Sequence, residues 1–164
     1  MQQWLSGMRG TVLMVLTWTV GWGLGFGGIM ELVDPHGQYG DVWPTAMALP
    51  GLLGGFVFCG LLRVAERGRS FNEAPLARAG VWGALAGLAL AALAIAKVAG
   101  PISRVISHVA LGMAAAFGAG GDGLRAPVAI AMLATLGAVA AFGSTVFFRL
   151  LARRQTPVVA RPRA

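Results

Sequence analysis

The sequence has little charge, few acids and a single cysteine. Of its 164 residues only 12% are charged, and six of them are aspartate or glutamate. A soluble domain is typically about 25% charged, so the low value indicates a chain whose main solvent is lipid. The one cysteine, Cys59, excludes a disulfide within the chain. Because it lies in an apolar stretch, we expect a small buried side chain rather than a reactive thiol.

Charge is absent altogether from four long apolar stretches, which cover residues 11–30, 43–62, 79–96 and 128–148. A helix rises 1.5 Å per residue, so about 20 residues cross the ~30 Å hydrocarbon core of a bilayer. We therefore predict an all-α integral membrane protein, a four-helix bundle of two helical hairpins in a single transmembrane domain over residues 1–164. The sequence has no Walker loop, C-x-x-C or H-E-x-x-H motif, and we predict that the protein is not an enzyme.

Basic residues are distributed unevenly among the connections. Ten of the 13 lysines and arginines lie in the N-terminal segment, in the connection 63–78 or in the tail 149–164, which four spans place on one side of the membrane. An excess of arginine marks the cytoplasmic side, so we predict that both termini are cytoplasmic. The net charge of +7 is then a signal for topology and a contact for lipid headgroups, and no binding to nucleic acid is expected.

Part of the second stretch and the connection after it resemble a known pattern. Gly54-Gly55 and the later run 65–69 (AERGR) are similar to segments of small bacterial membrane proteins. The resemblance covers a small part of the chain and implies no activity. We expect the protein in a bacterial inner (cytoplasmic) membrane, with an arginine-rich cytoplasmic tail over residues 149–164.

Residues 100–121 carry a different pattern. Ser103, Arg104, Ser107 and His108 fall on one face of a helix, and apolar side chains fall on the other. We predict an interfacial or re-entrant helix on the outer side of the membrane, begun by a proline and ended by a glycine-rich run. The alternative is a fifth span, which would place the C-terminal arginines outside. An imidazole can ligate haem iron or chlorophyll magnesium, but beside an arginine and two serines a solvated His108 is favoured.

Small residues four positions apart recur inside the first three spans. Such spacing lets helix backbones approach closely, so that dispersion and weak Cα–H···O contacts hold them together in lipid. Glycine is common in membrane helices, and a chain with 25 glycines produces some of these pairs by chance. We nevertheless predict packing faces, against another span or another subunit, at three pairs: Gly21 and Gly25, Gly51 and Gly55, and Gly83 and Gly87.

Trp18 and Trp22 are four residues apart, on one side of the first span. A pair of indoles in a membrane can stack on a pigment, a quinone or a lipid tail, whereas packing against lipid or against another helix is the commoner role. No cofactor is predicted. Bound lipid is expected, and a pigment is the alternative ligand.

The loop after the first span has four side chains with metal-binding atoms: Glu31, Asp34, His36 and Asp41. Oxygen and imidazole ligands this close in sequence are able to hold a divalent cation. Their spacing matches no recognised ligand motif, and an exposed turn explains them equally well. We therefore predict no metal site and keep the four residues as candidates.

The spans lack the buried acids that usually identify a membrane transporter. Small multidrug pumps with four spans depend on an acidic residue inside the first span, and here that span has none. We predict a non-catalytic subunit that packs through its small-residue faces into a larger membrane complex, such as a photosynthetic or respiratory assembly. Its partners are then membrane lipids and other transmembrane subunits or a second copy. The alternative is a small homo-oligomeric channel or carrier, with Thr45, Pro50 and Cys59 beside a narrow path.

Overall fold

A computed structural model describes residues 2–37, 42–65, 75–97 and 100–154. This part of the chain is helical and contains no strand. Its elements are α1 (Gln2–Val20), the π-helical segment η1 (Gly21–Phe26), α2 (Gly27–Val33), α3 (Trp43–Ala65), α4 (Leu76–Ala96), α5 (Pro101–Ala116) and α6 (Asp122–Arg154).

Four segments are long and apolar enough to cross a membrane: Arg9–Val33, Trp43–Ala65, Leu76–Ala96 and Gly123–Leu151. The predicted all-α bundle with four spans is therefore confirmed. The helices extend beyond the apolar stretches, because a helix needs no apolar side chains where its ends leave the hydrocarbon. The first part of the predicted tail accordingly continues α6 as far as Arg154, and the rest of it lies outside the described residues.

α6 begins several residues before the fourth apolar stretch. The helix starts at Asp122, and Pro127 lies inside it. A first turn forms ahead of the proline, where the amide of Arg125 donates to the carbonyl of Gly121 at 3.2 Å. So close to the start of a helix, a proline removes a single backbone hydrogen bond and leaves the apolar part of α6 intact.

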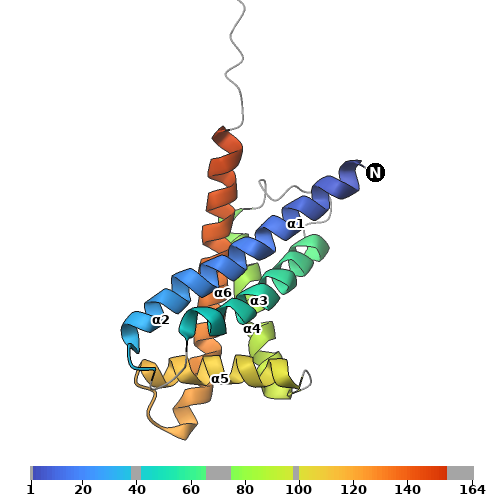
Figure 1. Ribbon diagram of the computed structural model, residues 1–164. Coiled ribbons are helices and arrows are strands. Elements are labelled where there is room, and N and C mark those ends of the chain that lie inside the picture. The colour runs from blue at the N-terminus through green and yellow to red at the C-terminus, as the bar shows by residue number, and fades with distance from the viewer. Residues whose placement is uncertain (1, 38–41, 66–74, 98–99, 155–164) are drawn as a thin grey trace, which may run out of the picture.

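The spans form two helix pairs that cross one another (Figure 1). α3 runs back along the first helix (α1, η1 and α2), and α6 runs beside α4 in the opposite direction. The start of α1, the end of α3, the start of α4 and the end of α6 lie toward one end of the molecule. We call this the basic end, since the described arginines Arg9, Arg63, Arg78 and Arg149 lie on these helix ends. α5 lies across the opposite end.

α4 and α6 approach until their backbones touch. A Cβ atom added at Gly83 would fall on the carbonyl oxygen of Gly137, and one added at Gly87 would fall on that of Leu133. In the other direction, a Cβ at Gly137 would fall on the carbonyl oxygen of Gly83. Only a hydrogen atom fits between these backbones, so Gly83 and Gly87 form a packing face within the chain.

α3 turns its own glycine pair toward the first helix. A Cβ added at Gly51 would lie 2.6 Å from the Cβ of Trp22, and one at Gly55 would lie 3.1 Å from the Cα of Val15. Because the glycines of α3 have no side chains, the tryptophan side chains of the first helix fit against the α3 backbone.

α5 is attached to the end of α4 by two serine hydroxyls. Ser103 Oγ donates to the carbonyl oxygen of Leu93 at 3.0 Å, and Ser107 Oγ donates to that of Ala94 at 3.3 Å. These carbonyls belong to the last turn of α4, where no later amide of the helix is available to them. Our placement of both serines on a water-facing side was wrong, because the hydroxyls pair with the helix end and Ser103 is only 1% exposed.

The outward side of α5 carries the charged part of the predicted polar face. Arg104 and His108 are exposed there, next to the exposed apolar side chains of Ile102 and Val105. A mixed face of this kind suits the boundary between headgroups and hydrocarbon. With 16 residues, α5 is not among the four helices long enough to span, so the structure has four spans rather than five.

Candidate functional site

The acidic loop is organised around one buried carboxylate. Asp34 is 5% exposed, and its Oδ2 accepts a hydrogen bond from Trp43 Nε1 at 3.2 Å, which joins the end of α2 to the start of α3. Glu31 and His36 are exposed, and Asp41 lies outside the described residues. Among the residues that the structure describes, no three His, Cys, Asp or Glu side chains gather around a common point. Asp34 therefore has a structural role in this loop.

The glycines of the first helix divide into two sets. Gly23 and Gly27 face α3: a Cβ added at Gly23 would lie 3.1 Å from the carbonyl oxygen of Pro44, and one at Gly27 would lie 2.5 Å from the Cα of the same proline. Gly21 and Gly25 are exposed, and a Cβ added at either would meet no described atom within 4 Å. We call Gly21 and Gly25 the open glycine face. They have no packing role within the described chain, unlike the pairs in α3 and α4.

The open glycine face lies on the π-helical segment. Three of the six residues of η1 are glycines, which disfavour a regular α-helix because they lose the most backbone entropy. A π-turn contains an extra residue, so the side chains after η1 point in directions that an unbroken α-helix would not give them. Such turns occur often at functional sites. Sequence periodicity assumes a uniform helix and therefore missed this feature.

The tryptophans of the first helix point into the protein. Trp18 and Trp22 are 1% and 0% exposed. The Trp18 ring stacks on Phe58 of α3, with centroids 5.0 Å apart and planes inclined by 24°, and it also stacks on Trp22 at 6.5 Å. Trp22 in turn meets the ring of Phe26 edge-on at 5.7 Å. Of the roles considered for the indole pair, the structure shows packing between helices.

Both indole nitrogens are buried without a hydrogen-bond partner in the described part of the chain. An unsatisfied buried donor costs about 1–3 kcal/mol, and most native structures have few of them. In the hydrocarbon core water does not supply the missing acceptor. The N–H groups of Trp18 and Trp22 are therefore buried donors that the described part of the chain leaves unsatisfied.

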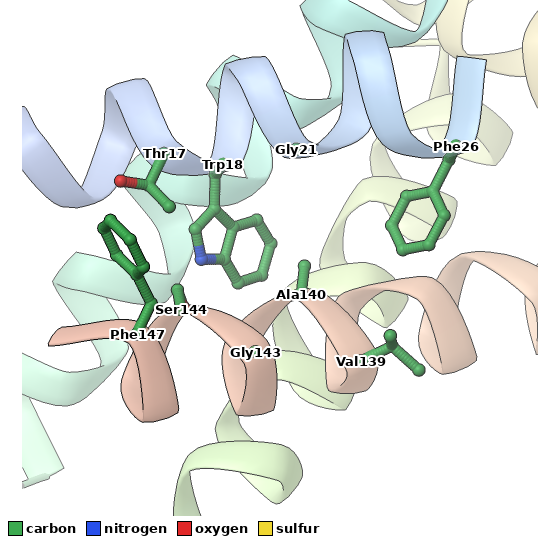
Figure 2. Close-up of a pocket in the computed structure, with 9 residues that line it drawn as sticks. All are labelled: Thr17, Trp18, Gly21, Phe26, Val139, Ala140, Gly143, Ser144 and Phe147. Atoms are coloured by element: carbon green, nitrogen blue, oxygen red, sulfur yellow. The ribbon is translucent and has the colours of Figure 1, made fainter. Parts of the chain in front are cut away.

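A pocket of about 210 Å³ lies between the first helix and α6, and Trp18 forms part of its wall (Figure 2). The other lining residues are Thr17, Gly21, Phe26, Val139, Ala140, Gly143, Ser144 and Phe147. The sequence analysis missed this pocket because its two walls are more than a hundred residues apart in the chain. The other candidate ligand, His108, is not among the residues that line it.

The hydroxyl groups of the pocket lie at one end. Thr17 and Ser144 flank Trp18 there, together with the ring of Phe147, whereas Phe26 and Val139 line the other end (Figure 2). The Thr17 hydroxyl donates to the Leu13 carbonyl at 2.8 Å, and the Ser144 hydroxyl donates to that of Ala141 at 3.1 Å. Because each hydroxyl proton is used within its own helix, the oxygens keep lone pairs available as acceptors. The indole N–H is the donor at this end.

The geometry identifies two features that the packing of a single chain does not explain. One is the open glycine face on η1, and the other is the pocket with an unpaired indole N–H. Comparison of the chain with protein-family models, with curated proteins and with solved structures finds no match.

Proposed function

We propose that the protein is a non-catalytic subunit of a larger membrane complex and that it docks another transmembrane helix on its open glycine face. One observation carries the proposal. The glycine pairs of α3 and α4 lie at close helix contacts within the chain, whereas Gly21 and Gly25 have the same spacing and meet nothing. In lipid, helices associate where small residues let their backbones approach, so the face is suited to a partner helix.

The surroundings of the open glycine face support the same proposal. Leu24 lies between the two glycines in sequence and is 72% exposed, and Val20 just before them is 54% exposed. Apolar side chains beside a shallow glycine surface form the ridge and groove that a second helix fills by van der Waals contact. The partner in this proposal is an apolar helix with small residues of its own, supplied by another subunit of an assembly such as a photosynthetic or respiratory complex.

The location in the proposal follows from charge. The arginine-rich basic end faces the cytoplasm of a bacterial inner membrane, and α5 lies at the outer surface. The open glycine face is then inside the bilayer, where it is accessible to helices but not to soluble proteins. Membrane lipids cover it when the partner is absent.

The test compares two glycines that are equally open. Gly25→Leu places a bulky side chain on the open glycine face, and Gly60→Leu makes the same change on α3, where a Cβ also meets no described atom within 4 Å. Each variant is expressed in its native host and purified in mild detergent, and the mass of the intact complex is determined. We expect foreign subunits in fixed stoichiometry with the wild type and Gly60→Leu, and their loss with Gly25→Leu.

Two results contradict the docking proposal. Retention of the same subunits by Gly25→Leu would show that the open face is not the interface. A homo-oligomer without foreign subunits, lost in Gly25→Leu, would instead favour self-association and the channel or carrier alternative.

The path that we considered for a channel is closed within one chain. Pro50 and Cys59 are buried, and the glycines between them are covered by the two tryptophans of the first helix. Thr45 is exposed at the start of α3 and does not continue into a passage with them. A conduction path would therefore have to form between copies of the chain, which is the outcome that the mass determination distinguishes.

A further inference from the structure

We infer that the pocket between the first helix and α6 binds an apolar molecule that carries a carbonyl group, and that the indole N–H of Trp18 donates a hydrogen bond to that carbonyl. Gly21 belongs both to the open glycine face and to the wall of this pocket, whereas Gly25 does not line the pocket, so the docking test at Gly25 is independent of the ligand test.

The donor is fixed in place before any ligand arrives. One face of the Trp18 ring stacks on Phe58, and the benzene edge lies against α3, where a Cβ added at Gly54 would be 3.0 Å from its Cζ3 atom. Figure 2 shows the indole nitrogen on the side of the ring nearer Ser144. The nitrogen is covered by neighbouring atoms and has no partner in the described chain, so an acceptor from the pocket reaches it only when side chains at this end move aside. A donor held in this way is prepared for an acceptor that comes from outside the protein.

The chemistry of the acceptor follows from the environment. A charged ligand is unfavourable in the hydrocarbon core, so a neutral oxygen is required. Among the described groups at the end with Thr17 and Ser144, the indole N–H is a donor without a partner, which suits a carbonyl oxygen. The hydroxyl oxygens of Thr17 and Ser144 are acceptors, and they can receive a hydrogen bond from a neighbouring hydroxyl on the same ligand.

The size of the pocket limits the ligand. An apolar cavity of about 150 Å³ is known to hold benzene, so the pocket of about 210 Å³ accommodates a substituted six-membered ring or the carbonyl end of an acyl chain. A tetrapyrrole is much too large for it. The pigment considered from the tryptophan pair is therefore not the ligand proposed for this pocket.

The pocket has an orientation relative to the bilayer. Thr17 and Ser144 lie in the halves of their spans nearer the basic end, Val139 lies near the middle of the span in α6, and Phe26 lies past the middle of the first span. Gly21, Gly143 and Val139 are exposed on the outer surface, so the pocket is accessible from the surrounding lipid. A ligand enters sideways from the bilayer with its carbonyl toward the basic end and its tail toward the middle.

Two classes of bilayer molecule have this chemistry, namely quinones and ester-linked lipids. A nuclear magnetic resonance experiment separates them. The full chain with ¹⁵N-labelled tryptophan is reconstituted in an ether-linked phospholipid, which has no carbonyl groups, and the indole N–H signal of Trp18 is assigned with the variant Trp18→Phe. Either a benzoquinone with a ten-carbon tail is then added, or the lipid is replaced by its ester-linked counterpart.

We expect the Trp18 indole proton to shift downfield, because an N–H proton shifts in that direction when it donates a hydrogen bond. A shift with the quinone alone identifies a quinone site, and a shift with the ester lipid alone identifies a lipid site. A shift with both supports carbonyl recognition in general. An unchanged Trp18 signal with both probes overturns the inference.

A matched pair of glycine variants tests whether the shift of the Trp18 indole proton arises from binding in the pocket. Gly143→Leu fills the pocket, whereas Gly60→Leu places the same side chain on the outer surface of α3. We expect the shift to be lost in the first variant and retained in the second, with the other tryptophan signals unchanged in both. If Gly143→Leu does not fold, Val139→Phe narrows the apolar end and should weaken the response. A full response in a folded pocket variant would overturn the inference, whatever the docking test shows.

Discussion

At the scale of single residues, the structure depends on positions where a side chain is missing. Trp18 and Trp22 are buried only because Gly51, Gly54 and Gly55 leave room for them on α3. The indoles bring large apolar surfaces and stacking contacts into the bundle. Glycine on one helix and tryptophan on the other thus act as complementary shapes.

The closeness of two backbones can be tested with a single methyl group. Gly87→Ala would place its Cβ on the Leu133 carbonyl oxygen, so we expect the unfolding free energy to fall by about 1–3 kcal/mol. Gly60→Ala meets no described atom within 4 Å and should leave the stability unchanged or raise it, because alanine favours a helix more than glycine does.

Unfolding of both variants in mixed detergent, followed by circular dichroism, gives the comparison. Equal stability of Gly87→Ala and Gly60→Ala would show that α4 and α6 are not in backbone contact.

At the scale of elements, α5 combines a buried apolar side, which includes Ile106 and Met113, with two polar contacts to the end of a span. Ser103→Ala removes a hydroxyl that donates to the Leu93 carbonyl at 3.0 Å, leaving a buried acceptor without that donor. We expect a loss of about 0.5–1.5 kcal/mol, which is the usual contribution of one hydrogen bond. Hydrogen exchange of the α5 amides should accelerate in Ser103→Ala, while those of α3 should not change.

Arg104→Ala is the control for α5, because Arg104 lies on the exposed side of the same helix. If this variant loosens α5 as much as Ser103→Ala does, the contact with α4 is not what holds the helix in place.

What the sequence could predict follows from how far apart the contacts are. The four spans were predictable because hydrophobicity is a property of consecutive residues. The buried side of α5 was misjudged because Ser103 and Ser107 pair with carbonyls at the end of another helix, and polarity alone does not distinguish such a serine from a solvated one. The pocket, the π-helical turn and the question of which glycine pairs lie at helix contacts depend on how α3, α4, α6 and the first helix pack together. A single sequence does not contain that information.

At the scale of the whole molecule, the arrangement of the helix ends makes topology testable. In a Cys59→Ala background, cysteines are introduced at Gly37, between α2 and α3, and at Ser70, in the connection after α3. We expect a membrane-impermeant maleimide to label Gly37→Cys in intact cells and to label Ser70→Cys only after the cells are opened. Labelling of Ser70→Cys in intact cells would show that the connection after α3 lies outside, which contradicts the proposed orientation.

The way in which the two helix pairs meet has a consequence for how the protein senses its surroundings. Within each pair, glycines bring backbones into contact, whereas α1 and α6 face each other across side chains and an open pocket. We expect the angle between the two pairs to change more easily than the spacing within each pair, because backbone contacts fix that spacing. Since spans tilt to match the thickness of the hydrocarbon, longer or shorter lipid chains should alter the distance between these two walls. The affinity of the pocket for a benzoquinone is then expected to vary with lipid chain length, so that the thickness of the bilayer itself regulates occupancy.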